Sequence, residues 1–171
     1  MLSREKYYDI ISETTLTAVD LILYYNGKIL LGYRKNQPAK NHWFTPGNRT
    51  GKMETLQQGF ERLVQTELGL DNKIVPFQQA KLVGVYDHIY NNNFKDDSFG
   101  THYVVTCFLY KLDKKVIITG DRQHADLKWF SIDDIEQNSE IHQYVKNYLP
   151  NINKLLHSKR TRDGKRSSLL R

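Results

Sequence analysis

The chain of 171 residues contains a single cysteine, Cys107, so no disulfide can form within it. No apolar run approaches the ~18 residues that a membrane-spanning helix needs. Residues 1–8 carry charges early and lack the apolar core of a signal peptide. Because the lack of a disulfide fits a reducing compartment, we expect a cytoplasmic protein. Because no apolar run is long enough, we expect no membrane span.

Excess charge of one sign is also missing from most of the chain. Residues 158–171 hold six basic side chains against Asp163, which is +5 of the total net charge of +6. The preceding residues therefore carry only +1. A basic face for nucleic acid is not indicated, and we expect no nucleic-acid partner. We expect 158–171 to be a solvated, disordered basic tail, with a weak anchor to an acidic partner as the alternative.

What remains has the composition of a folded domain. Hydrophobic residues make up 39% of the chain and aromatic residues 12%, too much for a disordered protein. Patterning and turn signals predict helices at 3–13, 54–68, from 131 and at 141–148, where Pro150 stops the last one, with a further turn at 152–156. They predict strands at 16–25, 28–34, 81–90, 101–112, 116–119 and 127–130, and loops at 48–53 and 91–100. With no repeat or internal linker, residues 1–157 read as one α+β domain.

Two acidic residues interrupt apolar patterns. Asp20 lies in a strand that is apolar on both faces, so we expect it to be buried or at the floor of a pocket. Glu67 falls in the middle of the apolar stripe of the helix at 54–68. A carboxylate there needs a partner or a cation, unless it leans out to water at the helix end. From the helix alone, both interpretations of Glu67 stay open.

The segment from Pro46 to Leu70 resembles a Nudix box, a pattern of glycine, glutamate and arginine residues at fixed spacing. Five residues separate Asn48 from Glu54, seven separate Glu54 from Arg62, and Glu67 follows at the last glutamate of the box. The spacing is therefore kept throughout.

Three positions of the box have changed residue type. Asn48 replaces the first glycine, a position where asparagine tolerates left-handed backbone angles, and Leu63 and Thr66 each replace a glutamate. Ordinary Nudix pyrophosphatases gather several carboxylates here to hold more than one metal ion at a phosphorus atom. Because Glu67 alone remains at this end of the box, a single divalent ion and a different cleaved bond are indicated.

Further motifs, in the same order, resemble the GDP-mannose mannosyl hydrolase family of the Nudix superfamily. They span about residues 1–156 and comprise Asn36 with Pro38-Ala39, Trp43-Phe44, Phe60-Glu61-Arg62-Leu63, Glu67-Leu68-Gly69-Leu70, Asn93-Phe94, Thr101-His102-Tyr103-Val104-Val105 and Gln123-His124. The resemblance implies an α+β fold with a Nudix-type mixed β-sheet sandwiched by helices, and a homodimer. It implies hydrolysis of GDP-mannose, or GDP-glucose, to GDP and free sugar. Water would attack the anomeric carbon with inversion, in a pathway of surface polysaccharide metabolism.

The same resemblance implies a cofactor and catalytic residues. Mg²⁺, with Mn²⁺ as a substitute, would be held by the Gly47 carbonyl, Glu67 and Gln123, all oxygen donors that suit this cation. His124 matches the general base, a role that suits imidazole because its pKa lies near neutrality. Arg34 matches the arginine on the diphosphate, where its planar donor fork suits phosphate oxygens.

Other residues match positions around the substrate. Asp20, His88 and Tyr103 match residues near the sugar and the diphosphate, with Asp20 placed among the catalytic residues as an acceptor for sugar hydroxyls. Arg49 and Arg62 match two further arginines, although Arg62 lies away from the buried stripe of its helix and is an equally good anchor for the box loop. The aromatic side chains available to stack on the base are Tyr7, Tyr8, Tyr90 and Phe94, with ordinary packing as the alternative for each.

Two other functions stay open. A Nudix pyrophosphatase that cleaves a phosphorus–oxygen bond of another nucleotide sugar is disfavoured by the lost carboxylates at Leu63 and Thr66. A non-catalytic nucleotide-binding module is disfavoured because the ligand and base positions are all retained, at Gly47, Glu67, Gln123 and His124.

Overall fold

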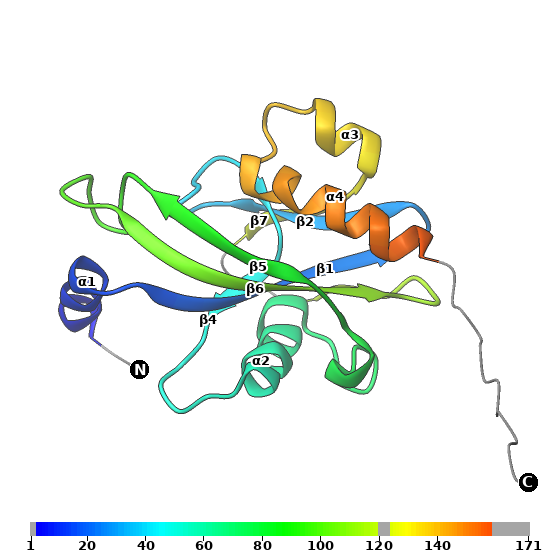
Figure 1. Ribbon diagram of the computed structural model, residues 1–171, viewed down its shortest axis with the longest axis horizontal. Coiled ribbons are helices and arrows are strands. Elements are labelled where there is room, and N and C mark those ends of the chain that lie inside the picture. Colours follow the sequence, from blue (N-terminus) through cyan, green and yellow to red (C-terminus); the bar gives the residue numbers. More distant parts are fainter. Residues whose placement is uncertain (1–2, 120–123, 159–171) are drawn as a thin grey trace, which may run out of the picture.

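The structure, a computed structural model, describes residues 3–119 and 124–158 (Figure 1). The helices are α1 (Arg4–Glu13), α2 (Leu56–Leu68), α3 (Ile132–Gln137) and α4 (Gln143–His157), with a short 3₁₀ helix at Phe77–Gln79. The strands are β1 (Leu16–Tyr25), β2 (Lys28–Arg34), β3 (Trp43–Phe44), β4 (Gly47–Arg49), β5 (Lys81–Tyr90), β6 (Thr101–Lys111) and β7 (His124–Ser131). None of the helices in these ranges is long and apolar enough to cross a membrane.

The strands form one mixed sheet with β1 at its centre. The order across the sheet is β3-β2-β1-β6-β5, with β4 paired to β1 and β7 paired to β2. β1 and β6 run parallel, and the other strand pairs are antiparallel. Side chains of β1 alternate between two hydrophobic cores, with Val19 and Leu21 in one and Ile22 in the other. The expectation that this strand is buried on both faces is confirmed.

Helices cover both faces of the sheet (Figure 1). On one face, α2 buries Phe60, Leu63, Val64 and Leu68 completely. On the other, α3 and α4 bury Ile135, Val145, Tyr148 and Ile152. Each of these aliphatic and phenylalanine side chains contributes roughly 1.5–3 kcal/mol of burial free energy. The predicted α+β architecture, a mixed sheet between helices, is confirmed.

Local signals predicted several boundaries correctly. The predicted limits of β1, β2 and β5 agree with the structure. Asn26 and Gly27 both have positive φ, +46° and +79°, as the predicted hairpin turn requires. Ser3 and Ser131 accept hydrogen bonds as N-caps of α1 and α3, and Gly69 ends α2 in the left-handed conformation with φ +63°.

Three predictions are wrong. Residues 116–119 do not form a strand. The start of the predicted loop at 48–53 belongs to β4, because Asn48 pairs with Val19 in the central strand. Pro150 does not stop the last helix, since α4 continues through it to His157. Proline cannot donate a backbone hydrogen bond within the helix. This loss is offset by the burial of the apolar side chains of Leu149 and Ile152 on either side of Pro150.

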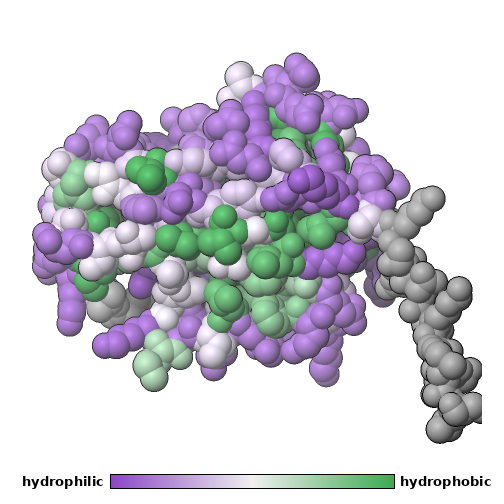
Figure 2. All heavy atoms as spheres, viewed as in Figure 1, coloured by the Kyte–Doolittle hydropathy of each residue, from purple (hydrophilic) through white to green (hydrophobic). Residues whose placement is uncertain are grey.

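The β5 strand forms one edge of the sheet and exposes apolar side chains. Leu82, Val85 and Ile89 are each more than half exposed, and Figure 2 shows a band of hydrophobic residues across the face where Figure 1 has β5 and β6. The hydroxyl of Tyr144 on α4 accepts from the Ile89 N–H and donates to its carbonyl, at 2.8 and 2.5 Å. These bonds cap one position of the edge against pairing with another strand.

Candidate functional site

A cavity of about 910 Å³ lies where α1, the loop after β2, and strands β1, β4, β5 and β6 meet. Eight of the predicted site residues line it: Asp20, Arg34, Gly47, Arg49, Arg62, His88, Tyr90 and Tyr103. They come from positions up to 83 residues apart, and the fold brings them to one place. Of the aromatic candidates for base stacking, Tyr7 and Phe94 also line the cavity, whereas Tyr8 does not.

The lining of this cavity is strongly cationic. Its basic residues are Arg4, Arg34, Lys35, Lys40, Arg49, Arg62 and Lys95, and its acidic side chain is Asp20. Residues 1–157 as a whole carry only +1, so positive charge is concentrated here. A concave site of one sign attracts ligands of the opposite sign. The cavity therefore suits a ligand with several negative charges, such as a diphosphate.

Arg34, at the end of β2, is one of these basic residues. Its Nε donates to the Pro38 carbonyl at 2.9 Å, and its guanidinium lies 6.0 Å from the centre of the Phe44 ring. No described residue hydrogen-bonds to its two terminal nitrogens. Its positive charge acts to lower the pKa of Tyr90 and of Tyr103, although burial dominates and raises both. The terminal nitrogens are thus available to a phosphate group.

Asp20 is buried, as its strand predicted, and its Oδ2 atom accepts two hydrogen bonds. Thr45 Oγ1 donates at 3.0 Å and the Tyr148 hydroxyl donates at 2.7 Å. Burial raises the pKa of Asp20 to about 6, although both hydrogen bonds and the charge of Arg34 act to lower it. Its other oxygen, Oδ1, faces Gly47, where any side chain would clash with it. This contact explains why glycine occupies position 47.

His88 on β5 belongs to the same buried network. Its Nε2 lies 2.9 Å from the Tyr148 hydroxyl oxygen, and its side chain is 3% exposed. Burial lowers the pKa of His88 to about 3, and a nearby histidine, His142, acts in the same direction. The imidazole is therefore neutral at physiological pH.

Arg62 anchors the loop between β4 and α2. Its Nε and Nη2 donate to the two carboxylate oxygens of Glu54 at 2.7 Å, and Nη2 also donates to the Arg49 carbonyl at 2.9 Å. Glu54 in turn accepts from the backbone N–H of Gly51 at 2.6 Å. The hydrogen bonds from Arg62 hold the pKa of Glu54 down at about 2. Arg62 lines the cavity, but its guanidinium is used to hold the loop.

The two residues that replace glutamates of the box, Leu63 and Thr66, do not serve as metal ligands. Leu63 is fully buried in the core under the sheet. Thr66 donates its hydroxyl to the Arg62 carbonyl one turn earlier, at 2.8 Å. Glu67 is only 4% exposed, so it does not lean out to water, and its charge acts on Arg62. Glu67 is not part of the lining of the cavity itself.

The chemistry of the predicted donor set fits Mg²⁺. Gly47 and Glu67 offer only oxygen atoms, one carbonyl and one carboxylate. Within residues 3–119 and 124–158, no three or more His, Cys, Asp and Glu side chains group together as a metal cage. An ion held by so few protein groups takes its remaining ligands from phosphate and water, which is the usual arrangement for Mg²⁺.

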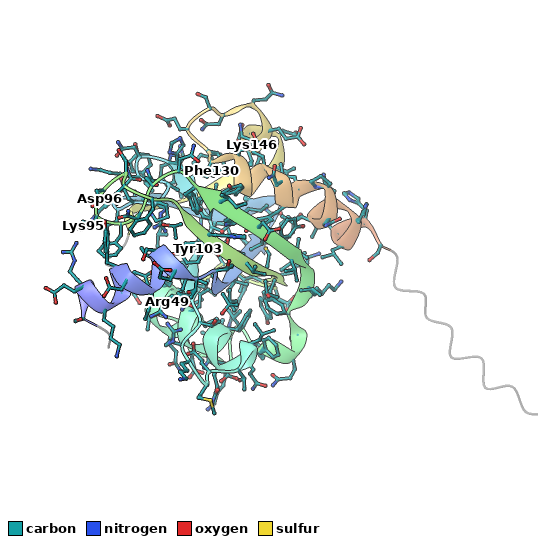
Figure 3. The ribbon with its side chains drawn as sticks, turned by 60° about the vertical axis from the view of Figure 1, so that its left-hand side comes forward. Arg49, Lys95, Asp96, Tyr103, Phe130 and Lys146 are labelled. Atoms are coloured by element: carbon teal, nitrogen blue, oxygen red, sulfur yellow. The ribbon has the colours of Figure 1, made fainter. Side chains whose placement is uncertain are left out.

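One wall of the cavity is a layered stack of aromatic rings and arginines. Tyr7 on α1 stacks on Phe94 with ring centres 5.2 Å apart. Arg4 lies 5.4 Å from the Phe94 ring centre and Arg49 lies 5.1 Å from that of Tyr7. The Tyr7 hydroxyl also lies 3.1 Å from that of Tyr103. Figure 3 shows Arg49, Tyr103 and the loop at Lys95 around α1.

Two predicted site residues, His124 and Gln123, precede or begin β7. The backbone of His124 begins β7 and pairs with Arg34, so this residue starts next to the arginine predicted to bind the diphosphate. Gln123, the third predicted metal ligand, lies outside the described residues, and so does the basic tail from residue 159.

Sequence reasoning missed two residues that support the site. Tyr148 joins Asp20 to His88, and His142 lies close enough to His88 to act on its pKa. Both belong to the last helical segment, where polar and aromatic residues alternate without a motif. The only signal for Tyr148 was its place on the buried face of an amphipathic helix. Such a pattern predicts packing in the core and says nothing about a role for the hydroxyl.

Comparisons with known proteins agree with the fold and with the box. A family model described as the NUDIX domain matches residues 14–152. A curated protein of Haloferax volcanii, "Low-salt glycan biosynthesis protein Agl8", is 33% identical over 145 residues, which cover 85% of this chain and 86% of that protein. The chain therefore belongs to the Nudix hydrolase family.

Solved structures show the same fold. A MutT NUDIX hydrolase from Burkholderia pseudomallei superposes with a TM-score of 0.66 at 24% identity, over 82% of this chain and 99% of that one. The NUDIX domain of Shewanella oneidensis NrtR, in a structure with ADP ribose, gives a TM-score of 0.63 at 18% identity, over 91% and 99%. At these identities the likeness concerns the fold alone.

Proposed function

We propose that the protein hydrolyses GDP-mannose, or GDP-glucose, to GDP and free sugar, with Mg²⁺ or Mn²⁺ as cofactor. The observation that carries this proposal is the loss of carboxylates from the box positions at the end of α2. Glu54 is paired with Arg62, Leu63 lies in the core and Thr66 bonds its own helix, so among these box positions Glu67 is the carboxylate that would hold a metal ion. A single ion favours assistance to a leaving diphosphate over the multi-metal attack on phosphorus of ordinary Nudix pyrophosphatases.

The polarity of the cavity supports a nucleotide sugar. Arg34 and Arg49 offer donors to a diphosphate, whereas the ionised Asp20 offers an acceptor to sugar hydroxyls. The layered wall of Arg4, Phe94, Tyr7 and Arg49 offers a base the guanidinium plane of an outer arginine, a group that stacks on aromatic rings. The name of the Haloferax relative, a glycan biosynthesis protein, agrees with a substrate that contains a sugar.

In the proposed reaction, a water oxygen bonds to the anomeric carbon as the bond from that carbon to the diphosphate oxygen breaks. The bonding electrons leave with GDP, and the water proton passes to His124 as general base. Arg34 balances negative charge on the departing diphosphate. A Mg²⁺ ion held by Gly47, Glu67 and Gln123 would supply further charge neutralisation at the same diphosphate.

Hydrolysis in ¹⁸O-labelled water tests the proposal directly. We expect GDP-mannose and Mg²⁺ to give labelled mannose and unlabelled GDP by mass spectrometry, and EDTA to stop the reaction. Label in a phosphate-containing product would instead identify a pyrophosphatase. Absence of turnover with GDP-mannose and GDP-glucose, together with tight binding, would favour the non-catalytic nucleotide-binding module.

The role of His124 has its own test. His124→Ala should lower kcat by several orders of magnitude and leave binding of the nucleotide sugar nearly unchanged, because a general base acts on water. His102→Ala is a matched control, since His102 is exposed and pairs with Asp87 at 3.0 Å, away from the cavity lining. Turnover retained in His124→Ala would rule out this base.

We also propose that the protein is a homodimer, as the family resemblance implies. Light scattering on the purified full chain measures this at assay concentration. A mass of one chain, about 20.1 kDa, would contradict the proposal.

A further inference from the structure

Tyr148 connects two predicted site residues that are far apart in the sequence. It lies on α4, fully buried, with its hydroxyl oxygen 2.7 Å from Asp20 Oδ2 on β1 and 2.9 Å from His88 Nε2 on β5. No other described side chain bonds to both residues. This hydroxyl therefore determines how the two polar groups are arranged relative to each other.

The direction of the hydrogen bonds follows from counting hydrogens. An ionised carboxylate only accepts, so the single hydrogen of the Tyr148 hydroxyl is donated to Asp20. The hydroxyl oxygen then has only lone pairs for His88, and Nε2 must carry a hydrogen to bond with it. Because a neutral imidazole has one N–H, Nδ1 of His88 is left with a lone pair.

The ring of His88 is held in place by aromatic neighbours. It stacks on Tyr144, with ring centres 4.2 Å apart and planes 3° from parallel. Phe44 meets it nearly edge to face at 5.8 Å. His88 lines the cavity, and no described residue hydrogen-bonds to its Nδ1. The lone pair on Nδ1 is thus fixed in orientation and available to a ligand.

We propose that Tyr148 is a positioning residue that holds His88 as its Nε2–H tautomer, so that Nδ1 accepts a hydrogen bond from a hydroxyl of the bound sugar. The sugar as ligand rests on the proposed function, whereas the tautomer does not. Nδ1 and the Asp20 carboxylate make this end of the cavity rich in acceptors. Phosphate oxygens are acceptors too and are repelled by these two groups, whereas the arginines of the cavity lining donate to phosphate oxygens. The arrangement selects one orientation of a sugar diphosphate.

Nitrogen-15 NMR of the unliganded full chain at pH 8 tests the tautomer. The His88 signals are assigned by their absence from the spectrum of His88→Gln. We expect the shift of a protonated nitrogen for Nε2 and of an unprotonated nitrogen for Nδ1. A hydrogen on Nδ1, or an even mixture of tautomers, would overturn the proposal from the wild-type spectrum alone, even if no variant of Tyr148 folds.

Tyr148→Phe removes the hydroxyl and keeps the ring. We expect its His88 spectrum to move toward a mixture of tautomers and kcat for GDP-mannose to fall about tenfold, the size of one lost hydrogen bond. Inhibition by GDP, which has no sugar, should be unchanged. Tyr144→Phe is the matched control, because it removes a hydroxyl from the same helix and retains the ring that stacks on His88.

The outcomes separate the two proposals. An unchanged tautomer in Tyr148→Phe overturns the role of Tyr148, whatever the activity. If the tautomer shifts as expected but the wild type turns over no nucleotide sugar, the role of Tyr148 in holding His88 stands and the proposed function fails. A loss of kcat equal in Tyr144→Phe and Tyr148→Phe would contradict the role of the Nδ1 acceptor.

Discussion

Arg62 and Glu54 show how one ion pair at residue scale shapes the site. Their side chains make two parallel hydrogen bonds of 2.7 Å, and Arg62 reaches past Glu54 to the Arg49 carbonyl. With its amide oxygen facing the guanidinium, Asn48 also accepts a hydrogen bond from Arg62 Nη1 at 3.1 Å. A partly exposed ion pair of this kind contributes only modestly to stability. Its value here is that it fixes the backbone that carries Gly47 and Arg49.

Replacing the planar guanidinium should therefore impair function more than stability. Arg62→Lys keeps the charge but cannot bond to both Glu54 oxygens and the Arg49 carbonyl together. We expect a loss of about 1 kcal/mol in the free energy of unfolding, and a fall in kcat/KM of about tenfold or more from the loosened loop. Urea unfolding and steady-state kinetics measure the two.

Gln57→Ala is the control for this prediction. Gln57 lies on the same helix, and its side chain donates to Glu61 at 2.8 Å and not to a residue of the loop. It should behave as the wild type. If Arg62→Lys also kept full activity, the ladder between β4 and β1 would be sufficient to hold the loop.

Which site residues could be predicted depends on whether they belong to a pattern. Asp20 was predictable because a carboxylate is conspicuous in an apolar strand, and its burial is confirmed. For Arg62, its position on the helix left two predictions open, contact with the substrate and anchoring of the box loop. Tyr148 lies 128 residues from Asp20, and no local rule relates two such positions. Only the packing of α4 across the sheet reveals its role.

At the scale of elements, α4 is where sequence rules and tertiary packing disagree. Pro150 predicts a stop, but Tyr148, Leu149 and Ile152 are all buried against the sheet and hold the helix together. Propensity is a weak prior when an amphipathic face has a surface to cover. The strands were easier to predict because alternation and the Asn26-Gly27 turn both determine register directly.

The start of α4 provides a pH-dependent prediction. His142 is its N-cap, and Nδ1 accepts from the Tyr144 N–H at 3.2 Å. Burial lowers the pKa of His142 from 6.5 to about 4, with His42 and Arg34 adding to the effect. The unfolded chain thus binds a proton at a higher pH than the folded chain does. Stability should therefore fall as the pH drops from about 6.5 through about 4.

His142→Asn should weaken this dependence. Asparagine is a good N-cap and does not titrate, so we expect similar stability at pH 7 and a smaller loss at pH 4.5, measured by urea unfolding. His88 keeps part of the dependence in both proteins, and Asp20, with its raised pKa, opposes it equally in both. His157→Gln, at the exposed end of the same helix, controls for the loss of a histidine. Identical pH profiles for wild type and His142→Asn would contradict the assignment.

At the scale of the whole molecule, the charge distribution matters more than the net charge. Most of the +6 belongs to residues 158–171, beyond the end of α4 at His157. The cavity is cationic for a different reason, since it gathers basic residues from α1, β2, β4, α2 and the loops in a body that carries only +1. The proposed division into a catalytic domain at 1–157 and a separate tail follows from this distribution.

Removing residues 159–171 should therefore leave catalysis intact. We expect the shortened chain to keep the Tm and the kcat/KM of the full chain, and to elute earlier from a cation-exchange column. Added salt should lower kcat/KM for the anionic substrate to the same degree in both chains, because it screens the charges of the cavity. If the shortened chain lost this salt dependence, the tail would be the source of the attraction, and residues 1–157 would not be the complete catalytic unit.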